Sequence, residues 1–162
     1  MNTVGTLFRI SIFGESHGPC VGLCIDGLPP GIPLEKTTFK EDMARRKAGG
    51  AGSTARIEDD KAQFLSGLYK GHTSGSPLCI IFPNQKHHPE EYDSLAQWPR
   101  PGHADFTASK KFGPWNDSRG GGHFSGRLTA AIVAAGAFAK YLLRPCIVSS
   151  NVIQAGGSDN IN

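Results

Sequence analysis

Two glycines near the start of the chain enclose a carboxylate, a hydroxyl and an imidazole, in the motif GESHG from Gly14 to Gly18. Because the ordinary pKa of histidine lies near physiological pH, His17 could act as a general acid toward a leaving group. The flanking glycines would let a substrate approach the backbone closely. The alternative interpretation is a polar hairpin turn whose histidine is simply hydrated.

A second pair of ionisable side chains follows the tripeptide Arg100-Pro101-Gly102, where His103 and Asp105 stand two residues apart. Asp105 could orient an imidazole or bind a hydroxyl, while His103 donates to a ligand. Alternatively, Asp105 caps a short helix that begins at Phe106. The sequence leaves both interpretations open.

The third set lies in a glycine-rich loop that opens into a helix, with Arg119 before the triple glycine 120–122 and His123 after it. The glycines can adopt positive φ, and Ser125 can cap the helix, whose first N–H groups lack internal partners. Loop and helix terminus would together form an anion site, to which Arg119 and Arg127 add charge. The alternative is a glycine-rich turn that simply ends a strand.

Three arginines, Arg45, Arg46 and Arg56, flank the small-residue segment 48–55, which we expect to form a flexible loop. Guanidinium groups are well suited to phosphate and carboxylate, so anion binding is one interpretation. A solvated helix end is the default alternative for such a charge run.

The histidine pattern does not indicate a metal site. The chain has six histidines, of which His87 and His88 are adjacent and would point apart on a strand. The sequence also lacks the H-E-x-x-H pattern that binds zinc from one helix face. We therefore expect no bound metal.

Short strands are the main elements expected to position these residues. Residues Thr6 to Phe13 alternate between apolar and polar side chains, which is typical of a strand that ends at the GESHG motif. The other strands that the pattern predicts are Val21 to Ile25, Phe64 to Tyr69, Leu78 to Phe82 and Cys146 to Ile153.

Two helices are expected. Thr38 and Glu41 have capping-box spacing at the start of a short helix, which Gly49 would end. A longer helix follows the glycine-rich loop and is rich in alanine, so it can be buried close to neighbouring elements. Arg127 and Lys140 bracket only twelve uncharged residues, which is too short a stretch to cross a bilayer.

Composition limits the classes of protein that fit. A length of 162 residues suits one domain with a real core, and 21 glycines predict many turns. The net charge of +3 suits a small anionic substrate but is too weak to indicate nucleic-acid binding. Arg9 and Glu15 interrupt the first apolar stretch, so the pattern of a signal peptide is absent.

The four cysteines do not have the paired spacing of a metal site. Cys20 and Cys24 fall on the same side of an expected strand, where we predict that they are buried. We interpret all four as reduced core thiols of a cytosolic protein.

Several long motifs, taken in order, resemble the chorismate synthase family from about Val4 to Leu143. The motifs are GTLFRISIFGESHG, DGLPPGIPL, RRKAGG, RPGHADFTASKKFG and DSRGGGHFSGRLTAAIVAAGAFAK. The resemblance implies an α+β fold, a β-α-β sandwich of antiparallel sheets around central helices. It also implies a cytoplasmic homotetramer.

The resemblance implies an activity as well. Family members are lyases of the shikimate pathway of aromatic amino-acid biosynthesis. They convert 5-enolpyruvylshikimate 3-phosphate to chorismate by a 1,4-anti elimination of phosphate. The reaction requires reduced FMN without net redox change, and NADPH could reduce that flavin. The implied partner is this small-molecule substrate, with neither nucleic acid nor a membrane.

Roles carry over by position. His17 matches the histidine thought to protonate the departing phosphate, and His103 matches one that stabilises the anionic reduced flavin. Arg46 matches an arginine of the substrate and pyridine-nucleotide region, with Arg45 as its helper. The run that matches FMN contacts is His123, Phe124 and Ser125. Further residues that we predict around the substrate are Ser16, Asp105, Arg119 and Arg127.

Two differences from the family stand out. Many members have arginine where this chain has His123, and Arg-Glu-Thr where it has Arg127-Leu128-Thr129. Family chains are also more than twice this long, and their second half supplies much of the FMN site. We therefore interpret residues 1–162 as the N-terminal portion of a single chorismate synthase domain. The alternative is a noncatalytic fragment that binds phosphate or flavin.

Overall fold

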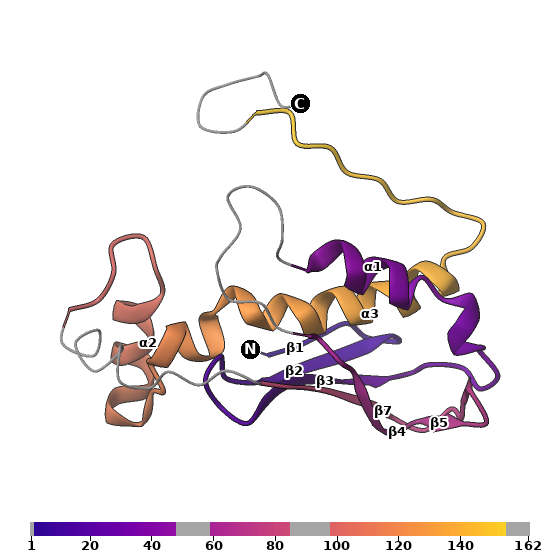
Figure 1. The fold of residues 1–162 in the computed structure, drawn as a ribbon, viewed down its shortest axis with the longest axis horizontal. Helices are drawn as coiled ribbons and strands as arrows, with labels where there is room; N and C mark the ends of the chain where they lie inside the picture. Colours follow the sequence, from indigo (N-terminus) through magenta and orange to yellow (C-terminus); the bar gives the residue numbers. More distant parts are fainter. Residues whose placement is uncertain (1, 48–58, 85–97, 155–162) are drawn as a thin grey trace.

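The centre of the fold is a five-stranded antiparallel sheet with the strand order β1-β2-β3-β7-β4 (Figure 1). The computed structural model describes residues 2–47, 59–84 and 98–154. The strands of this sheet are β1 (Thr3–Val4), β2 (Arg9–Gly14), β3 (Cys20–Asp26), β4 (Gln63–Ser66) and β7 (Leu78–Pro83). A two-stranded hairpin is formed by β5 (Leu68–Tyr69) and β6 (His72–Thr73).

The first four predicted strands are confirmed, with one division. The expected strand from Phe64 to Tyr69 is split into β4 and β5 at Gly67, which has a φ of +80°. Its backbone faces Leu78, where a Cβ on Gly67 would lie only 2.4 Å from Cα. Glycine is therefore required where the chain turns from one sheet into the other.

Two helices lie side by side on one face of the sheet (Figure 1). They are α1 (Phe39–Arg46) and α3 (Thr129–Leu142), and a third helix, α2 (Asp105–Phe112), lies beyond the end of the sheet. The 3-10 helices are η1 (Leu34–Lys36), η3 (Gly113–Trp115), η4 (Arg119–Phe124) and η5 (Gly126–Leu128).

The capping box predicted for α1 is wrong, because the side chain of Thr38 does not bond to the backbone of the helix. Thr38 is at the N-cap position, but its hydroxyl donates to Asp42 Oδ2 at 2.6 Å instead of accepting a backbone N–H. Gly49 and the predicted loop 48–55 lie outside the described residues.

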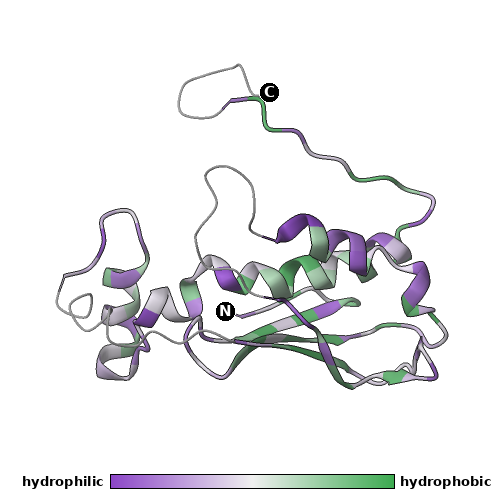
Figure 2. Ribbon diagram, in the orientation of Figure 1, coloured by the Kyte–Doolittle hydropathy of each residue, from purple (hydrophilic) through white to green (hydrophobic). Residues whose placement is uncertain are grey.

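The core lies between the sheet and the helix layer. Alternate residues of β3 and β7 are fully buried, namely Val21, Leu23, Ile25, Leu78, Ile80 and Phe82. Several alanines of α3 are equally buried, and their small side chains let the helix approach the strands closely. The hydrophobic colouring of the strands and of α3 contrasts with the mostly hydrophilic α1 (Figure 2). The mixture of helices and antiparallel sheet is the predicted α+β class.

Two predictions about the strands are wrong. Cys20 and Cys24 do share a face of β3, but it is the face away from the helices, so both are only half-buried, like Cys79. Residues 146–153 are exposed coil, and Cys146 is exposed, because the segment leaves the fold without a partner strand (Figure 1). Within the described ranges, α3 and the other helices are too short or too polar to span a membrane.

Candidate functional site

The GESHG loop, between β2 and β3, is joined to the glycine-rich η4 by contacts between residues far apart in sequence. The backbone N–H of Ser16 donates to the carbonyl of Gly122 at 3.0 Å. The ring Nδ1 of His123 donates to the carbonyl of Gly14 at 2.9 Å, since a carbonyl can only accept. Ser16 and His17 are thereby buried at 2% and 5% exposure. The loop is part of the folded interior and is not a hydrated hairpin.

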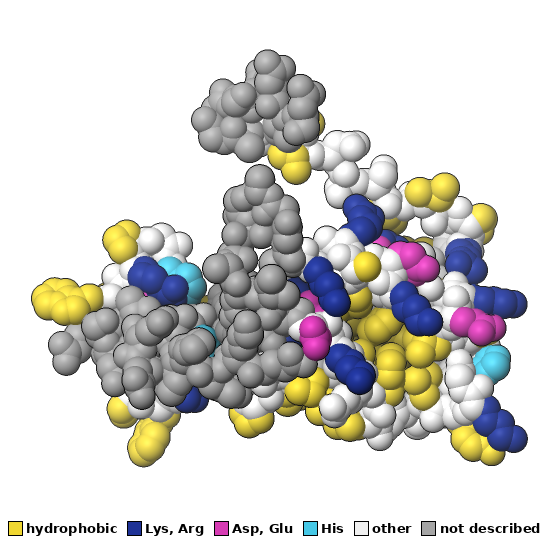
Figure 3. All heavy atoms as spheres, in the orientation of Figure 1, with side chains coloured by type: hydrophobic (Ala, Val, Ile, Leu, Met, Phe, Trp, Pro, Cys, Tyr) yellow, Lys and Arg dark blue, Asp and Glu magenta, His cyan; other side chains and the backbone are white. Residues whose placement is uncertain are grey.

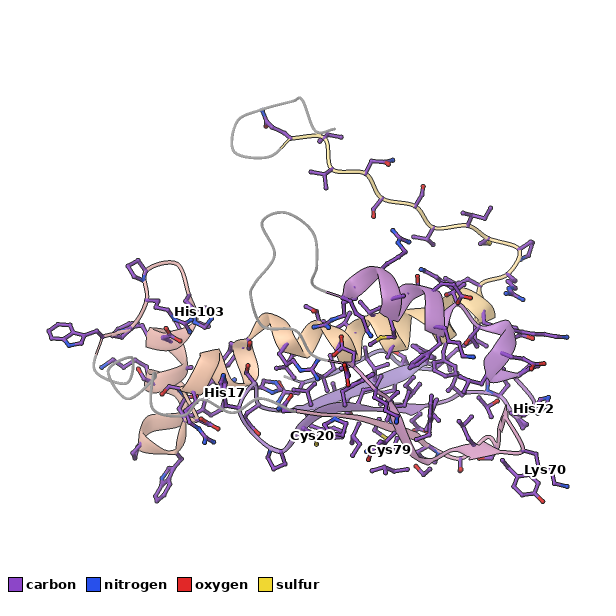
Figure 4. All side chains as sticks on the ribbon, in the orientation of Figure 1. His17, Cys20, Lys70, His72, Cys79 and His103 are labelled. Carbon is purple, nitrogen blue, oxygen red and sulfur yellow. The ribbon has the colours of Figure 1, made fainter. Side chains whose placement is uncertain are left out.

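Two neighbouring glycines of η4 each face a histidine. Gly120 has a φ of +57°, and a Cβ there would lie 2.3 Å from Cδ2 of His17. Gly121 has a φ of +87°, and a Cβ there would lie 2.9 Å from Cε1 of His103. The structure therefore brings His17 and His103 to the same end of the fold, and both lie there in Figure 4.

His103 is held by a carboxylate and a guanidinium. Its Nδ1 is 2.7 Å from Asp105 Oδ1, and Asp105 also accepts from Arg100 Nε at 2.7 Å and from Arg100 Nη2 at 2.9 Å. These bonds from Arg100 hold the pKa of Asp105 far below its usual range. Asp105 therefore orients an imidazole, as one interpretation expected. The alternative, a helix cap, is wrong because Ala104 occupies the N-cap position of α2.

A buried cluster of opposite charges lies where α1 meets the start of α3. Arg46 Nη1 donates to Asp60 Oδ2 at 2.5 Å, and Arg127 Nη1 donates to Asp60 Oδ1. The side chains of Arg127 and Asp60 are 5% and 2% exposed. Burial lowers the pKa of Arg46, although its guanidinium remains charged beside Asp60. Among the described residues, Nη2 of Arg127 has no hydrogen-bond partner, so this buried N–H group is available to donate to a ligand oxygen.

The other predicted arginines are more exposed. Arg119 forms a two-bond ion pair with Asp117 through Nε at 2.8 Å and Nη2 at 2.7 Å, which lowers the pKa of Asp117. Arg45 is exposed on α1 and, with Arg46, lines a groove of about 400 Å³ between α1 and α3. Basic side chains surround this part of the helix layer (Figure 3).

The run 123–125 serves partly to position the backbone. Phe124 is 41% exposed, with its ring 6.2 Å from that of Phe112. Ser125 Oγ accepts from the backbone N–H of Arg127 at 3.3 Å, so it caps η5, the turn that leads into α3. The predicted cap therefore forms on η5, while α3 itself begins after Leu128 without a side-chain cap.

No cluster of metal ligands occurs among the residues that the structure describes. Arg56, His87 and His88 lie outside those residues.

The analysis of the sequence missed three residues that organise this site: Asp60, Asn84 and Arg100. Asp60 and Asn84 bind Arg127 across 67 and 43 positions of the chain. No local pattern marks such partners. Arg100, in contrast, lies within five positions of Asp105, so its spacing could have suggested the ion pair.

Comparison with known proteins gives a consistent result. A sequence model of a family described as "Chorismate synthase" matches residues 8–161. Curated proteins named chorismate synthase are similar. That of Chitinophaga pinensis is 52% identical over 147 residues, covering 91% of this chain and 44% of that protein. That of Rhodospirillum rubrum is 45% identical over 162 residues, covering 96% and 44%.

A solved structure is also similar in fold. It is described as a crystal structure of chorismate synthase and superposes with a TM-score of 0.58 at 26% identity. The match covers 85% of this chain and 34% of that one. The chain thus spans less than half the length of the relatives that it matches.

Proposed function

This chain belongs to the chorismate synthase family, and we propose that it takes part in the reaction of that family. The reaction is a 1,4-anti elimination of phosphate from 5-enolpyruvylshikimate 3-phosphate, which gives chorismate and is classed as a lyase reaction. The observation that best supports the proposal is that His17 and His103 lie against neighbouring glycines of one loop. An eliminated phosphate needs a proton and nearby positive charge, and this end of the fold offers both.

His17 is the proposed acid. Its loop is held in place through Ser16 and Gly14, and His17 is largely buried beside Gly120, so its ring has a restricted orientation. A proton donor contributes most when it is fixed within reach of the leaving group. The proposed role of His17 is to protonate the departing phosphate.

The arginines are proposed to bind the anionic substrate. Arg127 and Arg46 share one carboxylate, Asp60, so the buried cluster keeps a net positive charge of one. Nη2 of Arg127, which has no partner within the part of the chain that the structure describes, supplies a buried donor, and a hydrogen bond from a charged group is strong. Arg45 and Arg119 would add charge from more exposed positions, and Ser16 and Asp105 would lie close to the substrate.

The residues near Gly121 fit a reduced flavin. His103, fixed by Asp105 and Arg100, places an imidazole beside Gly121, and the aromatic ring of Phe124 is partly exposed. Reduced FMN, when bound, supplies electron density to the substrate without net redox change. The proposed contacts are His103 with the anionic flavin and His123, Phe124 and Ser125 with FMN. Arg46 is proposed to bind the NADPH that would reduce FMN.

The second candidate is a noncatalytic fragment that binds phosphate or flavin. The observation that favours it is coverage, because the chain matches only 44% of the relatives' length. If the chain instead takes part in the lyase reaction, we propose that residues 1–162 form the N-terminal portion of a single domain, within a cytoplasmic homotetramer.

Phosphate release under anaerobic conditions separates the two candidates. The chain is mixed with 5-enolpyruvylshikimate 3-phosphate and chemically reduced FMN, and binding of FMN is followed by its absorption spectrum. Catalysis predicts repeated turnover. Binding of FMN without phosphate release would overturn the proposed lyase reaction and favour the noncatalytic fragment.

A further inference from the structure

Asn84 is a buried residue directly after β7, and its contacts reach into the loop that carries His17. It is 8% exposed. Its Nδ2 donates to the carbonyl of Glu15 at 3.0 Å and to the carbonyl of Gly18 at 2.7 Å. Its backbone N–H donates to the carbonyl of Pro19 at 3.1 Å. One residue thus binds the loop on both sides of His17.

The geometry determines which way the amide of Asn84 points. Both Nδ2 protons are used by loop carbonyls, and Oδ1 accepts from Arg127 Nε at 3.0 Å. Rotating the amide by half a turn would place its oxygen against two carbonyl oxygens and its NH₂ against a guanidinium. The pattern of donors and acceptors therefore permits one orientation.

Arg127 continues the contact away from the loop. Besides Asn84, it binds Asp60, which in turn binds Arg46 of α1. Nη2 of Arg46 also donates to the backbone carbonyl of Arg127, in η5 just before α3, at 3.4 Å. The loop that carries the proposed acid and the arginines proposed for the substrate are therefore parts of one buried polar network.

We propose that Asn84 is a positioning residue for His17, coupling the geometry of the GESHG loop to the Arg127–Asp60–Arg46 cluster. The inference rests on the proposed function, because it assigns Asn84 its role through the proposed acid. Asn84 itself does not supply a proton. It fixes where the backbone on either side of His17 lies, and Arg127 fixes Asn84.

The unmodified chain allows a first test by NMR. Side-chain amide protons that are bound to buried carbonyls exchange slowly with water, whereas exposed ones exchange freely. We expect the Nδ2 protons of Asn84 to show cross-relaxation with Glu15 and Gly18 and slow exchange, relative to the exposed Asn151. Exchange as fast as that of Asn151 would overturn the proposal.

Asn84→Asp tests the consequence, with Asn151→Asp as the matched control. A carboxylate retains the acceptor for Arg127 but cannot donate to the two loop carbonyls. We expect amide exchange at Gly18 to rise by about tenfold or more, because two hydrogen bonds are lost. In the release assay, kcat should fall by about tenfold because the loop is loosened. KM should rise as well, because the added carboxylate cancels the single positive charge of the Arg127–Asp60–Arg46 cluster.

The two measurements separate this inference from the proposed function. If the unmodified chain releases no phosphate, the NMR comparison still decides whether Asn84 holds the loop. If the chain is active and Asn84→Asp leaves both kcat and Gly18 exchange at the level of Asn151→Asp, Asn84 has no positioning role.

Discussion

A histidine lies beside a glycine-containing turn near each end of the fold, His17 in the GESHG loop and His72 in the β5–β6 hairpin (Figure 4). At one end His17 is buried, and its loop is bound by Asn84 from 66 and 69 positions away. At the other end His72 is exposed, and its Nδ1 bonds to the carbonyl of Lys70, only two positions away. Residue type and turn are therefore similar, but the side chain of His17 is buried and that of His72 is not.

The comparison shows what distinguishes a proposed catalytic turn from an ordinary one. The β5–β6 hairpin is closed by Lys70 and Gly71, both with positive φ, which is the pattern of a type I′ turn. Its backbone is also held from outside, since the N–H of Leu34 donates to the carbonyl of Gly71 at 2.9 Å, but the side chain of His72 stays exposed. The GESHG loop is held from outside itself by buried hydrogen bonds and charges. Burial together with this restraint fixes the His17 side chain for chemistry, whereas the backbone bonds of the hairpin leave the His72 side chain in water.

The largest effect that would test this difference is expected at Asp60. Asp60→Asn leaves the buried Arg127 and the half-buried Arg46 without their carboxylate, and we expect the free energy of unfolding to fall by about 3–5 kcal/mol. Urea denaturation measures it. As a control, Asp26→Asn removes the exposed pair with Arg9 at 3.8 Å and should cost less than about 1 kcal/mol. Equal effects would contradict the account of a buried network.

The glycines allow a second comparison. Gly120→Ala would meet both a φ of +57° and the ring of His17, whereas Gly31→Ala, near the other end, has a φ of +87° with open space around its Cβ. We expect about 1 kcal/mol of destabilisation at Gly31 from backbone strain alone. Overpacking should add about 1–3 kcal/mol at Gly120. Thermal unfolding of both variants would show whether contact with His17 matters, and identical losses would exclude it.

The dependence of stability on acid pH tests the ion pair between Arg100 and Asp105, which lies beside His103. Arg100 holds the folded-state pKa of Asp105 below its unfolded value of about 3.9, so this stabilisation is present above about pH 4 and is lost as the pH falls further. Asp105→Asn should flatten the decline in unfolding free energy between about pH 4 and pH 2, by about 1–2 kcal/mol. A decline parallel to that of the unmodified chain would show that Asp105 is not stabilised by Arg100.

The smallest effect is expected at the hairpin. Lys70 has a φ of +47°, which is unfavourable for a side chain with a Cβ but not for glycine. Lys70→Gly should therefore change the stability by less than about 1 kcal/mol, with relief of strain offset by greater freedom of the unfolded chain. A loss of several kcal/mol in denaturant titrations would contradict this expectation, because greater freedom of the unfolded chain accounts for only about 1 kcal/mol.

Local patterns in the sequence predicted much of the fold, and long-range contacts explain the rest. Alternation located β2, β3 and β7, but it could not say which face of β3 the helices cover, so the burial of Cys20 was predicted wrongly. The β-branched and apolar residues near Val148 suggested a strand, yet a strand needs a neighbour to bond with. Recognising such neighbours requires the three-dimensional structure.

The site divides in the same way. His17, His103 and the triple glycine stand in conspicuous motifs, and the structure brings them together. Asp60 and Asn84 have no conspicuous neighbours in sequence, since their importance lies entirely in what they contact. The residues expected to do chemistry and their local partner Asp105 were therefore visible in the sequence, while the distant residues Asp60 and Asn84 were not.

Anaerobic phosphate release by two histidine variants tests the central claim most directly. His17→Ala removes the proposed acid, and His72→Ala removes the exposed histidine at the opposite end. The account predicts that His17→Ala lowers the rate by about 10²–10⁴-fold, as expected for loss of a general acid, and that His72→Ala leaves it within about twofold. Full activity in His17→Ala, or equal losses in both variants, would contradict it.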